Sequence, residues 1–316
     1  MDPHPHDAFA VVIVNYGSPD LLAKNIGHEL DAEPAAQVVV VDNYHSAQAR
    51  ETTARLCDER GWLLVTSPND GFGAGVNRGI AAARALGHRV FITLNPDAEA
   101  SVHVLRELAH HARSHPDSLV SPIMDTGDGR PHFRGAGVHR RTGEMRSGWS
   151  PGDADPLWGN WLSGACLALS AEAFDRVAGF SEDYFLYWED VDISRRAAAL
   201  GMQLTLREDL LVVHDEGGTH NAPGSRSKSP LYYYFNIRNR LLFGRRMLRG
   251  RDRLRWLLAT PRQSLLIWMR GGRRQLFTHP RGAWSAVRGA LSGLSHPGPR
   301  ATAAAAGPTP WEGSPR

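Results

Sequence analysis

The chain has 316 residues, of which 42% are hydrophobic, and its formal net charge is +3 at pH 7. This size and composition suffice for a large folded domain with an appendage, and they exclude a chain that is disordered throughout. The two cysteines, Cys57 and Cys166, belong to no CxxC motif or Cys/His cluster, which argues against a disulfide framework and a zinc site and favours a reducing cytoplasm.

Residues 1–8 are predicted to form a flexible N-terminus. They lack the basic region and the apolar stretch of a secretory signal. No uninterrupted apolar run of the chain approaches the roughly 18 residues that a membrane span needs. We therefore expect a soluble or peripheral protein.

Short apolar runs alternate with helical patterns in the first half of the chain. The predicted strands are Phe9–Val14, Gln37–Val41, Trp62–Val65 and Arg89–Leu94, and the predicted helices are Asp20–Leu30, Ser46–Arg60, Gly75–Leu86 and Val102–Ser114. This alternation predicts an α/β fold with a Rossmann-like, mostly parallel central sheet flanked by helices. Ligands of such sheets bind beyond the carboxyl ends of the strands.

Polar residues and glycines follow each of the four predicted strands. In chain order they are Asn15 and Tyr16, then Asp42, then Asn69, Gly71, Gly75 and Asn77, and finally Asn95 and Asp97. Because the carboxyl ends of parallel strands share one edge of a sheet, we expect these side chains to converge.

Asp97 closes an apolar strand, where its carboxylate can point into a crevice. Mg²⁺ and Mn²⁺ prefer a few carboxylates together with phosphate oxygens, so a single strand-end Asp can be the principal protein ligand. The alternative is an Asx-type turn or a helix cap after Pro96.

The second half continues with a loop-rich stretch containing Gly135 and Gly137. A buried strand is predicted at Leu162–Leu169, followed by a helix at Ala171–Val177. A further helix ends at Gly201, and strands at Gln203–Leu206 and Leu210–Val213 follow it. The last of these strands leads into His214.

Three acidic residues, Glu189, Asp190 and Asp192, come directly after the five large residues Tyr184–Trp188. Carboxylates are favoured at a helix N-terminus, and helix capping accounts for one or two of them. Aromatic walls around a carboxylate desolvate it and raise its basicity, as a general base requires. We therefore interpret these acids as candidate catalytic residues.

His214 ends a strand of Leu and Val, a position where a lone histidine is often structural. Asp215, Glu216, two glycines and His220 follow at once, and this composition suits a metal or diphosphate site. Both interpretations stay open on the residues alone.

A dinucleotide-binding enzyme is an alternative reading of the glycine-rich run. The spacing of Gly73, Gly75 and Gly79 approximates the dinucleotide fingerprint, and Asp97 lies 18 residues beyond the last glycine. However, that fingerprint follows the first strand of its unit, whereas these glycines follow the third.

Taken in order, these motifs resemble those of the family 2 glycosyltransferases, particularly the bacterial rhamnosyltransferase-like branch, from about Phe9 to Arg246. The matching elements are Val14-Asn15-Tyr16, Asp42, the segment Asn69–Gly79, Asn95-Pro96-Asp97, Glu189-Asp190-Val191-Asp192 and His214. Asn95 replaces the first Asp of the family's DxD motif, which keeps an acceptor oxygen but removes one charge.

The resemblance implies a GT-A fold and an inverting hexosyltransferase. Its donor would be a nucleotide-diphosphate sugar, with dTDP-L-rhamnose suggested by the branch and UDP- or GDP-sugars still open. The acceptor would be a hydroxyl of a glycan, a lipid-linked glycan or a small molecule in bacterial cell-wall or polysaccharide biosynthesis. A nucleotide-sugar-binding protein without catalysis is the alternative.

The resemblance also implies roles for single residues. Asp42 would contact the nucleotide base, and Asn69–Gly79 would lie against the nucleotide. Asp97 would bind Mg²⁺ or Mn²⁺, assisted by His214. Asp190 would be the general base, with Glu189 and Asp192 arranging the acceptor pocket and the start of the helix.

The segment Arg238–Arg288 contains fourteen arginines and one acidic residue, Asp252, with Leu and Trp among them. This pattern suits a helix on an anionic membrane, so we expect peripheral contact with the inner face of the plasma membrane. Nucleic-acid binding and a solvated helical face are the alternatives. The loop Asn221–Pro230 is a candidate lid over the donor, with an ordinary loop as the alternative.

The predicted organisation has four parts. A GT-A catalytic domain at residues 9–235 contains a nucleotide-binding half, about 9–97, and an acceptor half, about 98–220. A basic helical extension is predicted at residues 236–290, and a disordered tail at 291–316.

Overall fold

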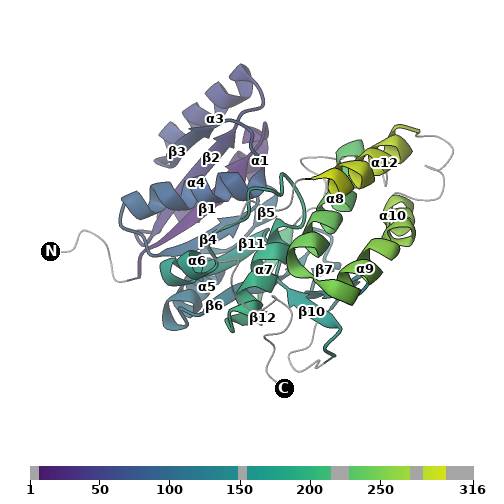
Figure 1. Cartoon of the computed structure of the whole chain (residues 1–316). Coiled ribbons are helices and arrows are strands. Elements are labelled where there is room, and N and C mark those ends of the chain that lie inside the picture. The colour runs from purple at the N-terminus through teal and green to yellow at the C-terminus, as the bar shows by residue number, and fades with distance from the viewer. Residues whose placement is uncertain (1–6, 149–154, 215–227, 271–279, 297–316) are drawn as a thin grey trace.

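The computed structural model of the chain describes residues 7–148, 155–214, 228–270 and 280–296. Within these ranges a central sheet is flanked by helices, and the helices from the last part of the chain gather at one side (Figure 1). None of the helices in these ranges is both long enough and apolar enough to cross a membrane.

The first four long strands form one parallel part of the sheet. β1 (Phe9–Asn15) lies between β2 (Ala36–Asn43) and β4 (Val90–Leu94), and β3 (Leu63–Ser67) pairs with β2. All seven residues of β1 are buried, as expected of a Val- and Ile-rich strand in the middle of a parallel sheet. The predicted α/β fold is confirmed, and these carboxyl ends meet at one edge.

The helices between these strands were predicted with one exception. α3 (Ala47–Arg60) and α5 (Val102–Ser114) begin after Ser46 and Ser101, whose side chains accept hydrogen bonds from the first turns. α4 is longer than predicted and spans Phe72–Ala85. The single helix predicted at Asp20–Leu30 is wrong: Ile26 is extended, and the segment forms α1 (Pro19–Asn25) and α2 (His28–Asp31).

The second half of the chain makes the sheet mixed. β11 (Cys166–Ser170) runs antiparallel between β4 and β6 (Ser118–Asp125), and β12 (Gln203–His214) is parallel to β6. Two short strands pair at the margin, β5 (Ala98–Glu99) with β12 and β7 (Pro131–Phe133) with β6. The two strands predicted between Gln203 and Val213 are one strand with a register shift between Arg207 and Leu211.

The predicted loop-rich stretch contains regular structure. Besides β6 and β7, it includes β8 (Ala136–His139) and β9 (Met145–Ser147), which form a small antiparallel sheet with β10 (Trp158–Trp161). The predicted strand Leu162–Leu169 begins four residues late, at Cys166, because a turn separates β10 from β11. Two helices follow, α6 (Ala171–Arg176) and α7 (Glu189–Ala199).

The last helices are α8 (Pro230–Met247), α9 (Gly250–Leu258), α10 (Thr260–Met269) and α12 (Pro280–Ser295). Trp256 of α9 is fully buried and donates its indole N–H to the carbonyl of Arg240 in α8. α8 spans the boundary predicted at residue 235. Residues 221–227 of the predicted lid, residues 297–316 of the predicted tail, residues 1–6 and the acidic segment after His214 lie outside the described residues.

Candidate active site

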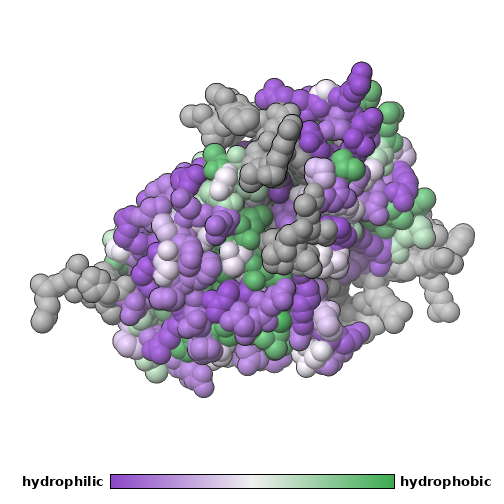
Figure 2. All heavy atoms as spheres, turned by 90° about the horizontal axis from the view of Figure 1, so that it is seen from below, coloured by the Kyte–Doolittle hydropathy of each residue, from purple (hydrophilic) through white to green (hydrophobic). Residues whose placement is uncertain are grey.

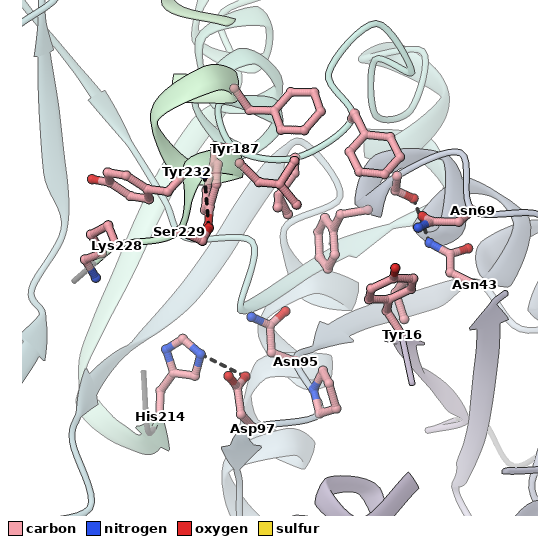
Figure 3. A pocket seen from close by; sticks show the side chains of 18 residues that line it. Tyr16, Asn43, Asn69, Asn95, Asp97, Tyr187, His214, Lys228, Ser229 and Tyr232 are labelled. Atoms are coloured by element: carbon pink, nitrogen blue, oxygen red, sulfur yellow. Dashed lines mark hydrogen bonds and ion pairs between the residues drawn. The ribbon is translucent and has the colours of Figure 1, made fainter. Parts of the chain in front are cut away.

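A pocket of about 470 Å³ opens at the carboxyl ends of β1, β2, β4 and β12 (Figure 3). Six residues predicted from the sequence line it: Tyr16, Asn69, Gly71, Asn95, Asp97 and His214. The rest of the wall comes mainly from the segment before α7 and from the start of α8. The expected convergence of strand-end side chains therefore holds for these six residues.

One end of the pocket is polar, and Tyr16, Asn43 and Asn69 lie together there (Figure 3). The side-chain N–H of Asn43 donates to the carbonyl of Gly71 at 3.0 Å. Its Oδ1 is buried and has no hydrogen-bond partner among the described residues. Because a buried amide oxygen is costly when unpaired, it is suited to accept a hydrogen bond from a ligand.

Gly71 brings two distant backbone segments together at this end. Its φ is +101°, and a Cβ at this position would overlap the backbone of Phe185. The N–H of Phe72 donates to the carbonyl of Phe185 at 2.9 Å. Only glycine combines this backbone conformation with this close approach, so the predicted glycine-rich segment shapes the pocket wall.

Four other predicted nucleotide-site residues, Asn15, Asp42, Gly75 and Asn77, do not line the pocket. Asp42 is buried and accepts a hydrogen bond from Nε of Arg50 at 2.6 Å, and Asn15 donates to Thr53 at 3.1 Å. A Cβ at Gly75 would lie 2.8 Å from Cγ1 of Val14, so this glycine lets α4 pack on β1. Asn77 bonds both the N–H and the carbonyl of Phe180 at 2.9 Å.

These four residues thus bind other parts of the chain and hold the strand ends and α4 in place. Their predicted contacts with the nucleotide stay predictions.

Asp97 and His214 face one another in the pocket (Figure 3). Nε2 of His214 lies 3.1 Å from Oδ1 of Asp97. The pairing of His214 with Ala98 across β12 and β5 sets this proximity. Nδ1 of His214 is buried without a hydrogen-bond partner in the described part of the chain.

The spacing of this pair fits a divalent cation. Adjacent ligands of an octahedral Mg²⁺, each about 2.1 Å from the ion, are about 3 Å apart. Within the described ranges no group of three or more His, Cys, Asp or Glu side chains is arranged to hold a metal. Asp97 and His214 could hold such a cation only together with further ligands, such as phosphate oxygens and water.

Asp190 and Glu189 begin α7 in surroundings that disfavour charge. Burial raises the pKa of Asp190 to about 6, although the N–H groups of Val191 and Gly164 donate to its carboxylate and oppose the shift. Burial first, and then the charge of Asp190, hold the pKa of Glu189 well above its usual range. A carboxyl group with a pKa near neutrality can accept a proton at physiological pH.

Asp190 stands just behind the pocket wall. A Cβ at Gly164 would lie 3.4 Å from both the Asp190 Cβ and the ring of Phe72, which lines the pocket. The next residue, Ala165, accepts a hydrogen bond from the N–H of Asn95 at 2.9 Å. One short turn therefore connects Asp190 with the part of the pocket that contains Asn95.

Asp192 is fully buried and belongs to an internal network. Its carboxylate accepts hydrogen bonds from the hydroxyl of Tyr184 at 3.2 Å and from Nε of Arg196 at 2.7 Å. These contacts secure the first turn of α7, on which Asp190 also lies.

The segment before α7 has an unusual backbone. Tyr187 and Trp188 have φ values of +68° and +78°, a conformation that costs about 1–3 kcal/mol for each non-glycine residue. Asn239 of α8 donates to the carbonyls of Leu186 and Tyr187, both at 2.8 Å. Tyr187 lines the pocket and packs against Tyr232 of α8. α8 therefore holds the wall in its strained shape.

Two polar residues of the pocket, Asn43 and Tyr232, were not among the predicted site residues. Asn43 directly follows Asp42 at the end of β2, so its position at a strand end was a usable signal. Tyr232 begins the aromatic run up to Phe235, which the sequence left without a function. Lys228, from the predicted lid, also lines the pocket.

The fold has solved counterparts among glycosyltransferases. The mannosyltransferase PcManGT from Pyrobaculum calidifontis, solved in complex with GDP-Man and Mn²⁺, superposes with a TM-score of 0.55 at 13% identity, covering 93% of this chain and 90% of that one. GalNAc-T7, solved with UDP, GalNAc and Mn²⁺, gives a TM-score of 0.52 at 15% identity, covering 86% and 57%. The chain therefore has the GT-A fold.

Sequence comparison then gives the family. The profile described as glycosyl transferase family 2 matches residues 10–175. The chain is 25% identical over 247 residues to the low-salt glycan biosynthesis hexosyltransferase Agl10 of Haloferax volcanii, covering 75% of each protein. It is 28% identical over 224 residues to N-acetylglucosaminyl-diphospho-decaprenol L-rhamnosyltransferase of Mycobacterium tuberculosis, covering 62% of this chain and 72% of that protein.

The chain belongs to glycosyl transferase family 2 and is a glycosyltransferase. The resemblance inferred from the motifs is confirmed, and the dinucleotide-dependent alternative is set aside.

Proposed function

We propose that the enzyme transfers a sugar from a nucleotide-diphosphate donor to an acceptor hydroxyl with inversion at the anomeric carbon. The observation that carries the proposal is the pocket in which Asp97 and His214 lie 3.1 Å apart, with the turn leading to Asp190 beside it. The donor's nucleoside would lie toward Asn43 and Asn69. Its diphosphate would lie at Asp97 and His214.

Asp97 and His214 would hold a divalent cation, Mg²⁺ or Mn²⁺, with Asn95 close by. When bound, such a cation neutralises charge that develops on the departing diphosphate. Asn95 is uncharged, so the protein contributes one negative charge from this motif. Lys228 lines the same pocket and supplies a positive charge for phosphate oxygens.

Asp190 would remove the proton from the acceptor hydroxyl. With a pKa of about 6, it is mostly ionised at pH 7 and basic enough to accept that proton. As the proton leaves, the acceptor oxygen forms a bond to the anomeric carbon and the bond to the diphosphate breaks on the opposite face. A single displacement of this kind inverts the configuration.

Glu189 and Asp192 would be positioning residues in this reaction. The N–H groups of Val191 and Gly164 stabilise the ionised form of Asp190, whereas Glu189 lacks a partner for its buried Oε2 in the described ranges. Of the two neighbours, Asp190 is therefore the group expected to carry the charge.

For the donor and acceptor we propose a hexosyl transfer, with dTDP-L-rhamnose as the first donor to test. The names of the two relatives, a hexosyltransferase of glycan biosynthesis and an L-rhamnosyltransferase for a diphospho-decaprenol acceptor, support this choice. A lipid-linked glycan is the corresponding acceptor. Contact with the cytoplasmic face of an anionic membrane completes the proposal, supported by the arginine-rich C-terminal segment.

The test measures release of nucleoside diphosphate. The protein is incubated with Mn²⁺ or Mg²⁺ and a panel of dTDP-, UDP- and GDP-sugars, with and without acceptor. We expect acceptor-dependent release from one donor, loss of release with chelator, and loss in Asp97→Asn. If no donor stabilises the protein against heat or yields product with any divalent cation, the proposal is wrong.

A further inference from the structure

Helix α12 packs against α8 through its smallest residues. Gly282, Ala286, Gly289 and Gly293 recur at spacings of four, three and four, which places them on one face of the helix. A Cβ at Gly293 would lie 2.8 Å from the Cβ of Leu241, and one at Gly289 would overlap a backbone carbonyl of α8. The inner face of α12 is therefore small so that the two helices can approach closely.

The outer face of α12 carries its large apolar side chains. Four of them are about half exposed or more: Trp284 (62%), Val287 (50%), Leu291 (60%) and Leu294 (49%). Their spacings of three, four and three keep them on one side of the helix. A surface helix normally turns such a stripe toward the core. We call these four residues the α12 stripe.

A contiguous exposed apolar stripe indicates an interaction surface. Exposed leucines also occur on α10, which packs against α12, at Leu265, and on α9, at Leu254 and Leu258. Figure 2, which views the molecule from below, shows single hydrophobic residues scattered among hydrophilic ones on that face.

The part of the sequence that contains the stripe is strongly basic. From Arg249 to His296 the sequence has ten arginines and one acidic residue, Asp252. Asp252 is already occupied, since Nε of Arg140 lies 2.7 Å from its carboxylate. On α12 itself, Arg281 and Arg288 are exposed. A binding partner that complements the α12 stripe and these arginines therefore offers an apolar region bordered by negative charge.

We propose that the α12 stripe lies in the headgroup region of an anionic lipid bilayer, with the helix parallel to the membrane plane. The proposal deepens the membrane contact of the proposed function, on which it rests, by assigning that contact to one face of one helix. Apolar side chains bordered by arginines are the arrangement that binds anionic interfaces. Two copies joined through the same face would bring arginines against arginines, which disfavours a symmetric dimer.

The test is sedimentation of the full chain with vesicles of phosphatidylglycerol and phosphatidylcholine, or of phosphatidylcholine alone, at low salt. We compare the parent with Leu291→Glu/Leu294→Glu. The matched control is Leu86→Glu at the end of α4, where the leucine is similarly exposed, at 42%. A second variant, Arg281→Gln/Arg288→Gln, removes charge and leaves the stripe intact. Circular dichroism checks that each variant is folded.

We expect the parent to bind anionic vesicles and the stripe variant to bind at least about tenfold more weakly. The control should bind like the parent. The arginine variant should lose binding to anionic vesicles, and binding of the parent should weaken at about 1 M salt.

Three results would overturn the inference: no binding of the parent, equal losses in the stripe and Leu86 variants, or a parent dimer that the stripe substitutions convert to monomer without any lipid binding. Release of nucleoside diphosphate in vesicle-free solution tests the proposed reaction separately, so failure of one proposal is distinguishable from failure of the other.

Discussion

Replacing Asp190 with Asn should stabilise the protein at neutral pH and remove the proposed base. The pKa of Asp190 is raised from 3.8 to about 6, chiefly by burial. Because the folded-state pKa is the higher one, this carboxyl group contributes stability that is fully present below about pH 4. That contribution is lost as the pH rises through about 6.

The magnitude follows from the shift of about two pKa units. One unit corresponds to about 1.4 kcal/mol, so the ionised carboxylate costs the folded state about 3 kcal/mol above pH 6. Asn is never charged, and its side-chain oxygen can still accept from the N–H of Gly164. We therefore expect Asp190→Asn to raise the free energy of unfolding by up to about 3 kcal/mol at pH 7.5. At pH 4 the two proteins should have nearly equal stability.

Differential scanning calorimetry at pH 4, 5.5 and 7.5 measures this difference as a rise in the unfolding temperature of several degrees at the highest pH. Product formation should fall on the order of 10²- to 10⁴-fold in the same variant. The control is Asp175→Asn, whose exposed carboxylate pairs with Arg84 and has a lowered pKa, so its stabilising contribution diminishes as the pH falls.

A lower unfolding temperature of Asp190→Asn at pH 7.5, or a change that is the same at pH 4 and pH 7.5, would contradict the reasoning about burial. Unchanged product formation would instead remove the assignment of Asp190 as base.

Three further predictions concern the metal and the packing. Asp97→Asn should weaken Mn²⁺-dependent binding of the donor by at least about tenfold, as measured by isothermal titration calorimetry. Thermal unfolding should show that the unfolding temperature of the unliganded protein is not lowered. Gly79→Ala should lower the free energy of unfolding by about 1–3 kcal/mol, because the new Cβ would overlap a valine of β1. In the control Gly27→Ala the new Cβ has no neighbouring atoms, so the free energy of unfolding should change by less than about 0.5 kcal/mol. Urea unfolding measures both values. Asn77→Ala should cost about 1–3 kcal/mol, because both backbone groups of Phe180 lose their bonds to its side chain, and hydrogen exchange at Phe180 should accelerate.

The parallel half of the fold could be predicted because its pattern is local. The Val- and Ile-rich strands and the helices between them are visible in short windows, and Ser46 and Ser101 mark two helix starts. The break after Asn25 was missed because the sequence on both sides of Ile26 has a helical pattern, although Ile26 itself is extended in the structure. The strands between Ser118 and Ser147 were missed because β7, β8 and β9 span only three or four residues each and β6 contains Pro122, so the stretch resembles a loop in sequence.

The candidate site was predictable where it depends on strand ends and less so where it depends on tertiary packing. Parallel strands bring Tyr16, Asn69 and Asp97 to one edge by topology alone. In contrast, the side chain of Asn77, which was predicted at the nucleotide, does not line the pocket and bonds Phe180, and its contact with the nucleotide stays a prediction. The predicted start of its helix, α4, was wrong by three residues.

The strained turn at Tyr187 and Trp188 has a consequence for how the enzyme matures during synthesis. The strands that carry Tyr16, Asn69 and Asp97 leave the ribosome early, since chains fold from the N-terminus as they are made. Asn239, which holds the turn, emerges only afterwards. A nascent chain can therefore assemble the strand ends that carry Tyr16, Asn69 and Asp97 first, and we expect the turn at Tyr187 and Trp188 to be held in its final shape only after α8 has docked.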